Sequence, residues 1–566
     1  MNKKRAIILN TAIIFSFFLV FMRLIDLMIL NYERFSERAK IQHVKVEDIQ
    51  ARRGMIFDRH GRELALNIDL ESLYCDPETL SLNNDNLIRL ASLISKEPEV
   101  ILSRIPPERR FAWLGRKLEP NITQEVKKLN IKGLDFLTEA KRFYPKEKLA
   151  AHVIGFVGID NQALEGAELE YDKYMSPPAG KVAFRRDAYG RTLSSGVDRE
   201  INGNNIVLTI DEGLQYLVEK ELDNAMKQWS ASAASVIMMD PFSGEILALA
   251  NRPTYNPNRP GASRVAHRRN RAITDCYEPG STFKIIIGIA ALEEKISRPN
   301  THFDVSKGYI EVGGKIIRDL HKHETLTFKE IIQKSSNVGS ITIGQKLGKE
   351  RIYKYAKYLG FGEKTGVDLP GEVSGWIYPP EKWSGTSVGA ISIGQEVAVT
   401  PIQILRAYSA IANGGFLVSP HVVSKILSPE GQVFKPSRDI TMKRVISAET
   451  AETFKEILKS VVEEGGTGRK AFIDGNEVAG KTGTAQIINP LTKGYSKEKF
   501  VSSFVGFVPA DNPRLAMIVV IYEPEGQSYG GVVAAPVFRD IANKALSYLN
   551  IPRDDTFNES PVLVLR

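Results

Sequence analysis

A serine and a lysine lie three residues apart at the start of a strongly apolar stretch. Ser281 and Lys284 follow the chain-breaking pair Pro279-Gly280, and residues 285–292 are almost entirely apolar. This pattern predicts a buried helix with both side chains on one face of its first turn. Burial disfavours the charged form of a lysine, and a neutral amine can take the proton of a serine hydroxyl. The two residues are therefore a candidate nucleophile and its base.

The Ser-x-x-Lys spacing alone is a weak signal, because the chain repeats it. Ser496 and Lys499 have the same spacing in a charged segment without an apolar helix after it, which predicts a solvated loop. The ordinary interpretation of Ser281 is a helix N-cap, with Lys284 as a surface residue. Further motifs must decide between these interpretations.

A second candidate motif is Ser335-Ser336-Asn337, which follows a helix-like stretch over residues 326–333. The hydroxyl of Ser335 could relay a proton between the lysine and a leaving group, and the amide of Asn337 could bind a peptide carbonyl. Ser81-Leu82-Asn83 matches the same pattern in a polar loop, so this motif is also weak by itself.

The third candidate motif lies in residues 478–488, which read as a strand. Small residues such as Gly483 would let a substrate backbone lie close alongside it. Lys481 offers a positive charge for a carboxylate, and Thr482 and Thr484 offer hydroxyls. Residues 364–366 repeat Lys-Thr-Gly, but glycine and proline on both sides predict a loop there.

Each motif recurs once, but one copy of each has a suitable setting, and those copies run in the order 281, 335, 481. The ordered combination is far more specific than its parts. It indicates an acyl-transfer site built on a serine and a lysine.

The elements around these motifs predict an α+β domain over residues 204–550. Residues 206–211 read as a strand, 214–229 as an amphipathic helix, and 234–250 as a β-hairpin around Pro241-Phe242-Ser243-Gly244. Before this domain, residues 31–203 alternate strand-like runs with short polar helices and show no catalytic pattern. We expect them to form an accessory domain, and residues 551–566 to form a C-terminal tail.

The N-terminus predicts a membrane anchor. Basic residues fill positions 3–5, and residues 6–30 form an apolar stretch long enough to span a bilayer of about 30 Å. The basic start places the tail 1–5 in the cytoplasm and everything after the anchor outside. A cleaved signal peptide is the alternative, but no Ala-x-Ala site precedes Asn31. Arg23 and Asp26 could pair with each other or meet a partner helix in the membrane.

Composition excludes several classes of function. The 566 residues carry a formal charge of +8, which is small for this length and does not argue for nucleic-acid binding. Cys75 and Cys276 are far apart, and neither the cysteines nor the eight histidines form a ligand pattern. We therefore expect no zinc site.

With these motifs, the chain resembles the penicillin-binding, serine-acyltransferase superfamily, and within it the class B penicillin-binding proteins of the division-specific type. The resemblance covers nearly the whole chain. The segments that carry it, besides the three motifs and the anchor, are Arg53–Arg59, Leu208–Asp211, Gly244–Ala248, Gly394-Gln395, Gly465–Thr467, Ser503–Phe507, Ala535–Phe538 and, for the division type, Asn270–Asp275. The resemblance implies an antiparallel sheet flanked by helices, a strand-rich pedestal domain and one transmembrane helix.

The resemblance also implies a reaction that needs no metal and no organic cofactor. Ser281 would attack the carbonyl between the two terminal D-alanines of a peptidoglycan stem peptide, and Lys284 would take its proton. The N–H groups of Ser281 and Thr484 would hold the oxyanion, and Ser335 would pass a proton to the leaving D-alanine.

The remaining residues would bind the substrate. Lys481, Thr482 and Thr484, with Gly483 between them, would hold the substrate carboxylate, and Asn337 would hold its amide. An amine of a neighbouring stem peptide would then form the cross-link.

The same resemblance implies a setting for the enzyme. β-Lactams would acylate Ser281, and the substrate would be lipid-linked nascent glycan. The anchor and pedestal would contact a glycan polymerase of the FtsW type and other division proteins. The catalytic domain would lie outside the bacterial cytoplasmic (inner) membrane and act in septal wall synthesis, without nucleic acid as a partner.

Four rival interpretations remain open from the sequence. An elongation-type transpeptidase differs from the division type only in a short segment before the nucleophile. A β-lactamase needs neither anchor nor pedestal, and a membrane β-lactam sensor needs a cytoplasmic signalling region that residues 1–5 are too few to supply. A division subunit without catalysis would not need the three intact motifs.

Overall fold

The computed structural model describes residues 3–33, 44–48, 52–105, 111–176, 181–186, 192–193, 202–436, 442–488 and 494–553. By its contacts the chain forms a smaller unit, Met1–Arg53 with Ser176–Gly203, and a larger unit, Gly54–Met175 with Asn204–Arg566. Most of the predicted segment between the anchor and residue 44, and the C-terminal tail after residue 553, lie outside the described residues.

The smaller unit contains the apolar N-terminal helix. Helix α1 spans Lys3–Ile25 and continues into a π-helical turn, η1, at Asp26–Leu30. Within the described residues, Ile7–Leu30 is the one helical stretch long and apolar enough to cross a membrane, with a mean hydropathy of 2.4 and no burial. Arg23 and Asp26 form an ion pair of 2.6 Å, so the two charges of the predicted anchor neutralise each other.

The same unit holds a small antiparallel sheet in the order β1-β8-β9. Its strands are β1 (Val44–Asp48), β8 (Lys181–Arg186) and β9 (Thr192–Leu193).

A seven-stranded sheet in the larger unit includes strands from distant parts of the sequence. Its order is β19-β18-β10-β2-β3-β4, with β5 also paired to β3. The strands are β2 (Ile56–Phe57), β3 (Glu63–Cys75), β4 (Ala112–Leu118), β5 (Leu134–Phe143), β10 (Asn205–Leu208), β18 (Val423–Leu427) and β19 (Val433–Pro436). Strand β10 pairs with β2 on one side and with β18 on the other. Strand β10 begins just after the predicted domain boundary at residue 203, and it pairs with one strand from before that boundary and one from after it. The boundary stays a prediction.

One end of this sheet carries its own small core. Helices α3 (Asn84–Leu93), α4 (Pro98–Ser103) and α5 (Pro120–Lys128) pack there with β3 and β4. The side chain of Asn83 caps α3 by accepting a hydrogen bond from the N–H of Asn86 at 2.8 Å. As predicted, Ser81-Leu82-Asn83 is thus a loop that leads into a helix.

The second large sheet is antiparallel and five-stranded, in the order β12-β11-β23-β22-β21. Its strands are β11 (Ala233–Met239), β12 (Ile246–Arg252), β21 (Ala479–Ile488), β22 (Tyr495–Val508) and β23 (Leu515–Tyr522). The predicted hairpin is confirmed as β11 and β12. Strand β21 lies at the sheet edge, where one side of a strand is left for other partners.

Both faces of this sheet are buried, because alternate residues of its strands enter different cores. Val236 and Met238 of β11 belong to the core with α9 (Glu212–Gln228) and α19 (Ala535–Tyr548). Ile237 and Met239 belong to the core on the opposite side. The sheet is therefore the middle layer of three, and the predicted class, an antiparallel sheet flanked by helices, is confirmed.

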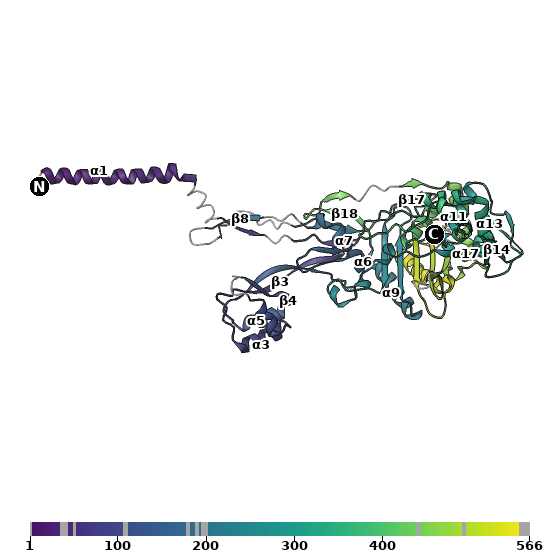
Figure 1. Cartoon of the computed structure of the whole chain (residues 1–566), viewed down its shortest axis with the longest axis horizontal. Coiled ribbons are helices and arrows are strands. Elements are labelled where there is room, and N and C mark those ends of the chain that lie inside the picture. The colour runs from purple at the N-terminus through teal and green to yellow at the C-terminus, as the bar shows by residue number, and fades with distance from the viewer. Residues whose placement is uncertain are drawn as a thin grey trace, which may run out of the picture. The chain divides into compact units, whose positions relative to one another are not determined.

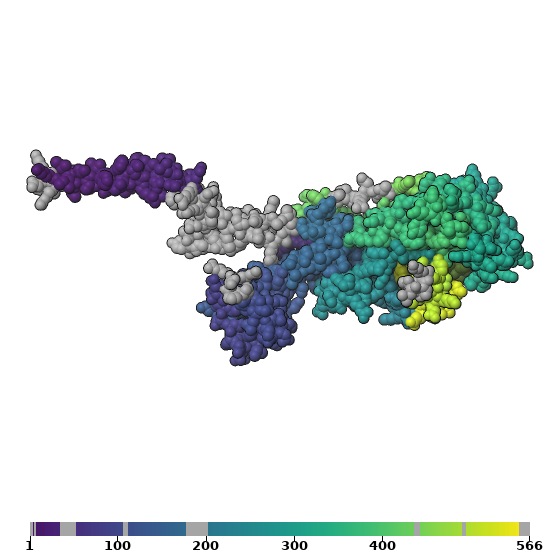
Figure 2. Space-filling model, in the orientation of Figure 1, coloured from purple at the N-terminus to yellow at the C-terminus, as the bar shows by residue number. Residues whose placement is uncertain are grey.

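The second core is formed by helices that lie close together in Figure 1, where α11, α13 and α17 are labelled side by side. The C-terminal segment, yellow in Figure 2, lies against green and teal segments of the larger unit, in agreement with the packing of α19 on α9. The helices of this second core include α11 (Lys284–Glu293), α12 (Phe328–Gln333), α13 (Asn337–Leu347), α14 (Lys349–Tyr358), α16 (Pro401–Ala412) and α17 (Ala448–Val462).

Short elements complete the larger unit. The helical ones are α6 (Ala151–Ile154), α7 (Gly166–Glu170), α8 (Asp172–Met175), η2 (Pro260–Ala262), η3 (Val265–His267), α10 (Arg271–Thr274), η4 (Gly280–Phe283), η5 (Pro380–Lys382), α15 (Ser387–Ser392), η6 (Arg469–Ala471) and α18 (Gly530–Val533). The strands are β6 (Phe156–Val157), β7 (Ala163–Glu165), β13 (His302–Asp304), β14 (Tyr309–Val312), β15 (Lys315–Arg318), β16 (Thr325–Thr327), β17 (Phe416–Leu417) and β20 (Lys443–Arg444).

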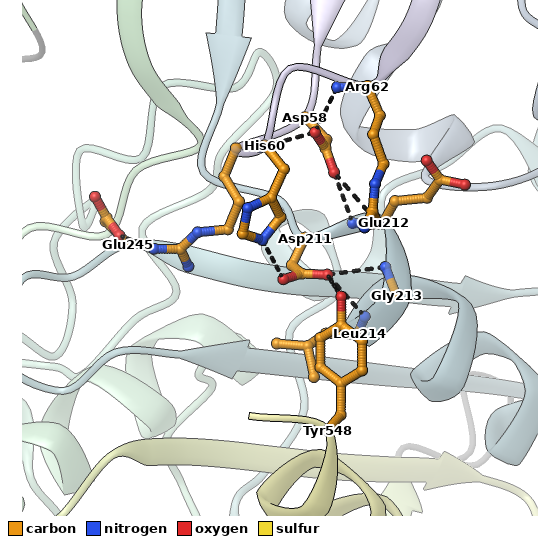
Figure 3. Close-up of polar contacts among 10 residues, drawn as sticks. Asp58, His60, Arg62, Asp211, Glu212, Gly213, Leu214, Glu245 and Tyr548 are labelled. Carbon is orange, nitrogen blue, oxygen red and sulfur yellow. Dashed lines mark hydrogen bonds and ion pairs between the residues drawn. The ribbon is translucent and has the colours of Figure 1, made fainter. Parts of the chain in front are cut away.

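A polar cluster joins the turn after β2 to α9 and α19 (Figure 3). The buried carboxylate of Asp58 accepts hydrogen bonds from the backbone N–H groups of His60 and Arg62, both at 2.8 Å. Asp211 caps α9, and it also contacts Nε2 of His60 at 2.9 Å and the hydroxyl of Tyr548 at 3.0 Å. Two buried carboxylates thus fix three segments that are far apart in the sequence.

The prediction of a solvated loop at Ser496–Lys499 was wrong. These residues begin β22, and their charged side chains are exposed on it. The flanking residues Tyr495 and Phe500 pair with Ile488 and Gln486 of β21, so the polar residues between them are included in the strand at a point where its register shifts. Lys364-Thr365-Gly366 is a loop, as predicted.

Candidate active site

Ser281 lies in the short 3₁₀ turn η4, and α11 begins at Lys284 directly after it. The apolar stretch forms the predicted buried helix, because Lys284 to Ala291 are all buried. Gly280 has a φ of +55°, and a Cβ added there would lie 2.8 Å from the carbonyl oxygen of Thr484. Glycine therefore lets the Ser281 turn approach β21 closely.

Lys284 has no solvent exposure, and its ammonium contacts the second motif. Nζ donates to the backbone oxygen of Ser335 at 2.6 Å, to Oδ1 of Asn337 at 2.9 Å and to Oγ of Ser335 at 3.2 Å. Oγ of Ser335 in turn lies 2.9 Å from Oγ of Ser281. No hydrogen bond joins Lys284 to the Ser281 hydroxyl directly among the described residues, so the contacts favour transfer through Ser335.

Burial lowers the pKa of Lys284 to about 7, and the negative charge of Asp319 opposes this shift. A large fraction of the lysine is then neutral near neutral pH, and a neutral amine can accept a proton. The direction of this pKa shift agrees with the predicted desolvation of Lys284, and its role as a base stays a prediction.

The second motif forms the turn between α12 and α13. Ser335 has a φ of +58°, a left-handed conformation that costs a non-glycine residue about 1–3 kcal/mol. The side chain of Ser336 caps α13 by accepting from the N–H of Gly339 at 2.9 Å. Asn337 is the first residue of α13, and its Nδ2 donates to the backbone oxygen of Arg318 at 3.1 Å. This turn points the Ser335 side chain at Ser281.

Asp319 fixes this turn, although it is not among the site residues predicted from the sequence. Its carboxylate accepts hydrogen bonds from the Ser336 hydroxyl at 2.6 Å, from the backbone N–H of Val338 at 3.0 Å and from the N–H of Asn337. An aspartate on a polar loop after a hairpin gives no local signal of such a role. Only the fold brings the loop to the start of α13.

The third motif lies on a strand, as predicted, and this strand, β21, is at the edge of the five-stranded sheet. Lys481 is fully buried, with Nζ 3.4 Å from Oγ1 of Thr482. The pKa of Lys481 is well below the usual value for a lysine. Burial is the larger cause, and the positive charge of Lys284 is the smaller one. Gly483 faces inward, because a Cβ there would lie 2.3 Å from Oγ of Ser503 and 2.9 Å from Cγ2 of Thr282.

The two threonines of this strand make polar contacts at their hydroxyls. Oγ1 of Thr482 lies 3.0 Å from Oγ1 of Thr467, and Oγ1 of Thr484 accepts from the N–H of Gly530 at 3.0 Å. From the sequence, Thr467 is noted only as part of the segment Gly465–Thr467 that carries the family resemblance, although its hydroxyl contacts the third motif directly.

A cavity of about 940 Å³ opens on these residues. Its lining includes five of the predicted site residues, namely Ser281, Ser335, Asn337, Thr482 and Thr484. Lys284 and Lys481 lie buried behind this wall, and Gly483 packs against the neighbouring strand. The fold therefore brings together three motifs from distant parts of the sequence. Among the described residues, no group of three histidine, cysteine or acidic side chains could hold a metal ion.

Two family models match the chain. The penicillin binding protein transpeptidase domain matches residues 234–543, which contain all three motifs. The penicillin-binding protein dimerisation domain matches residues 48–208.

Related proteins cover most of the chain. Stage V sporulation protein D of Bacillus subtilis is 35% identical over 531 residues, which are 92% of this chain and 82% of that protein. Peptidoglycan D,D-transpeptidase FtsI of Escherichia coli is 33% identical over 538 residues, which are 93% of this chain and 89% of that protein. Probable peptidoglycan D,D-transpeptidase PenA of Neisseria meningitidis is 34% identical over 534 residues, with 93% and 89% covered.

Solved structures have the same fold. Penicillin binding protein 3 of Mycobacterium tuberculosis, complexed with aztreonam, superposes with a TM-score of 0.69 at 28% identity, and covers 90% of this chain and 98% of that one. The same protein complexed with ampicillin gives a TM-score of 0.70, with 92% and 98% covered.

Proposed function

Since the chain belongs to the penicillin-binding protein transpeptidase family and is a class B peptidoglycan D,D-transpeptidase, we propose that Ser281 is its acylated nucleophile. The observation that carries the proposal is the row of three atoms Ser281 Oγ, Ser335 Oγ and Lys284 Nζ, spaced by 2.9 and 3.2 Å. Such a row can move a proton from the nucleophile to a buried base.

Acylation uses this row in one direction. With Lys284 neutral, the Ser281 hydroxyl donates to Ser335, and the Ser335 hydroxyl donates to the lysine amine. Oγ of Ser281 attacks the carbonyl carbon between the two terminal D-alanines, and the new C–O bond leaves an oxyanion. We assign the N–H groups of Ser281 and Thr484 to this oxyanion.

The same row works in reverse when the tetrahedral intermediate breaks down. Lys284, now an ammonium, returns its proton through Ser335 to the nitrogen of the leaving D-alanine, and the C–N bond breaks. The amine of a second stem peptide then attacks the ester, loses its proton by the same route and forms the cross-link. Ser281 regains its hydroxyl, so atoms and protons balance over the cycle.

Binding roles follow from position. Thr482 and Thr484 present hydroxyls to the cavity for the terminal carboxylate of the substrate. Lys481 is buried, so we assign it the orientation of the Thr482 hydroxyl, 3.4 Å from its Nζ, rather than direct contact with that carboxylate. Asn337 holds the substrate amide, and Gly483 keeps β21 close to the Ser281 turn.

In the cell, we assign this chemistry to the septum of a dividing bacterium. The similarity to FtsI proteins supports this assignment. The apolar helix supports a single-pass protein with its N-terminus in the cytoplasm and its catalytic domain outside the inner membrane. A glycan polymerase of the FtsW type is the partner that would supply nascent strands. We place the functional boundaries at residues 5, 30, 203 and 550, as the sequence predicts.

A specialised role is the second candidate, because the chain is 35% identical to a protein named for sporulation. An elongation role is the third. All three share one chemistry, so a fluorescent fusion decides between them. A signal at the mid-cell of dividing cells supports the septal role, and a signal along the side wall or confined to sporulating cells contradicts it.

Labelling with a fluorescent penicillin tests the chemistry. We expect a stable labelled band in membranes that carry the protein, and no band for Ser281→Ala. Ser496→Ala is the matched control, since it removes the serine of the second Ser-x-x-Lys copy on β22. Labelling that survives in Ser281→Ala contradicts the proposed nucleophile, and rapid loss of the label would favour a β-lactamase.

A further inference from the structure

The cavity beside Ser281 has walls with an excess of positive charge. Among the described residues that line it, Asp319 is the only carboxylate, and its oxygens accept hydrogen bonds from the first residues of α13. The basic lining residues are Arg318, His321, His323, Lys334, Arg469 and Lys470. A cleft lined by charges of one sign attracts ions of the opposite sign strongly.

Three of these residues, Lys334, Arg469 and Lys470, form what we call the cationic mouth. Lys334 ends α12 and directly precedes Ser335. Arg469 and Lys470 form η6, shortly after Thr467.

Two contacts of Thr467 hold the segment that leads to Arg469 and Lys470 next to the site. The N–H of Thr467 donates to the backbone oxygen of Gln333 at 3.3 Å, and its Oγ1 lies 3.0 Å from Oγ1 of Thr482. The cationic mouth therefore flanks Ser335 on one side and the start of the third motif on the other.

Within the described part of the chain, Arg469 and Lys470 have no carboxylate partner, whereas Lys334 lies near Glu330 and helps to lower the pKa of that carboxyl. None of its three residues takes part in an ion pair there, and the Arg469 guanidinium lies over the ring of Phe472, 4.3 Å from its centroid. The lysines of α17, by contrast, are paired with carboxylates: Lys455 contacts Glu452 at 2.9 Å, and Lys459 contacts Glu456 at 3.2 Å. Positive charges are thus left unpaired at the cavity, where a ligand can reach them.

The order of the reaction steps indicates which ligand the cationic mouth binds. The terminal carboxylate of the donor leaves with D-alanine before the second stem peptide arrives. The incoming amine must then occupy the place of the departed amine, because it gives its proton to the same Ser335. Lys334 directly precedes Ser335 in the lining of the cavity, so an acceptor amine at Ser335 is close to the cationic mouth.

We propose that the cationic mouth binds a free carboxylate of the acceptor stem peptide, close to its nucleophilic amine. This inference rests on the proposed function and names its second substrate. The acceptor is an anionic peptide with a carboxylate beside the amine, rather than one whose amine stands on a neutral chain.

Two acceptor peptides that differ in one group test the inference. One has a carboxylate on the amine-bearing carbon and the other has a carboxamide there. The full-length enzyme is acylated with a thioester donor, an acceptor is added, and mass spectrometry gives the ratio of cross-linked to hydrolysed product. We expect the carboxylate acceptor to raise this ratio about tenfold over the carboxamide in the wild type, since charge-assisted hydrogen bonds are about twice as strong as neutral ones. Raising the salt concentration should reduce the advantage.

The variant Arg469→Gln/Lys470→Gln should reduce the advantage to about twofold or less. Both side chains are exposed and have no ion pair among the described residues, so the two substitutions break no ion pair that stabilises the fold. Lys227→Gln/Lys364→Gln is the control, because it removes the same charge from exposed positions that do not line the cavity. This control should keep the full advantage.

Two outcomes overturn the inference alone: equal cross-linking of both acceptors by an acylated wild type, or a preference that survives in the Arg469/Lys470 variant. Failure of the wild type to form an acyl-enzyme at Ser281 is a separate result, visible in the same experiment, and it contradicts the proposed function together with the inference.

Discussion

At the scale of single residues, the site depends on the desolvation of one lysine. Lys284 is buried between α11 and the Ser335 turn, and its contacts there are a backbone oxygen, a hydroxyl and an amide oxygen. None of these partners is an anion, so they do not offset the loss of water as a carboxylate would. The neighbouring Asp319 restores part of the stability of the ammonium.

Lys284→Ala should lower the rate of acylation by penicillin by about 10²–10⁴-fold, because the base is removed. Rates of labelling under one set of conditions measure this, and a thermal melt checks the fold. Lys364→Ala, in the loop copy of Lys-Thr-Gly, is the control and should label normally. A normal acylation rate in Lys284→Ala would remove lysine from the mechanism.

The acylation rate should rise with pH through about 7 and then level off, because only the neutral form of Lys284 accepts a proton. Asp319→Asn removes the negative charge that raises the pKa of Lys284, so its inflection should move to lower pH. The pH profile of the labelling rate measures both. Asp304→Asn, an exposed carboxyl on β13 outside the cavity lining, should leave the inflection in place. An inflection that stays or moves upward in Asp319→Asn would contradict the assignment.

At the scale of elements, three segments meet because small residues let them approach. The Ser281 turn and α18 both pack on the middle of β21, so closely that a Cβ at Gly530 would lie 2.2 Å from the carbonyl oxygen of Gly483. The position of the nucleophile relative to the substrate strand is therefore set by backbone contact rather than by long side chains.

Gly483→Ala should lower both stability and acylation. The added methyl group would press on Ser503 and Thr282, and overpacking of this kind costs about 1–3 kcal/mol. The denaturation midpoint and the labelling rate measure the two effects. Gly261→Ala is the control, since a Cβ there meets nothing within 4 Å. Wild-type stability and labelling in Gly483→Ala would mean that the two segments need not be in such close contact.

The polar cluster of Figure 3 is an anchor point of the larger unit. Asp211→Ala removes the N-cap of α9 and the acceptor of the Tyr548 hydroxyl, so the free energy of unfolding should fall by about 1–2 kcal/mol. Urea denaturation measures this. Asp474→Ala, at an exposed position, should change it by less than about 0.5 kcal/mol. An unchanged free energy in Asp211→Ala would show that the cluster is not stabilising.

At the scale of the whole molecule, the chain combines an apolar N-terminal helix, a strand-rich region and a transpeptidase domain. The helix is exposed along Ile7–Leu30, and its Arg23–Asp26 pair removes the net charge that would oppose insertion. The lining of the active-site cavity comes entirely from residues after 279. Attachment to a membrane and acyl transfer are therefore assigned to separate parts of the chain.

Deletion of residues 1–30 should move the protein from the membrane fraction to the soluble fraction without loss of penicillin labelling at Ser281. Fractionation followed by labelling measures both, with the full-length protein as the control. Membrane retention of the shortened chain would mean that another segment binds the membrane. Loss of labelling would mean that the helix supports the fold of the site.

The sequence by itself determined the chemistry and most of the elements near it. Ser281 and Lys284 are three residues apart on one turn, so local helix geometry alone places them on one face. The apolar composition of residues 285–292 predicts burial, and residues 478–488 of the third motif read as a strand, although only the sheet order places this strand at an edge. The same local rules failed at Ser496–Lys499, because pairing of the flanking residues with β21 brings this charged segment into a strand.

Only the tertiary structure decided how the motifs cooperate. The contact between the Ser335 and Ser281 hydroxyls, the burial of Lys481, the bonds of Asp319 at the start of α13 and the gathering of the cationic mouth all depend on segments that are distant in the sequence. Spacing along a chain fixes neighbours within a turn of helix or a pair of strands, but contacts across loops depend on how whole layers pack. Those contacts set the desolvation and the fields that make a serine, a lysine and a strand into an acyl-transfer site.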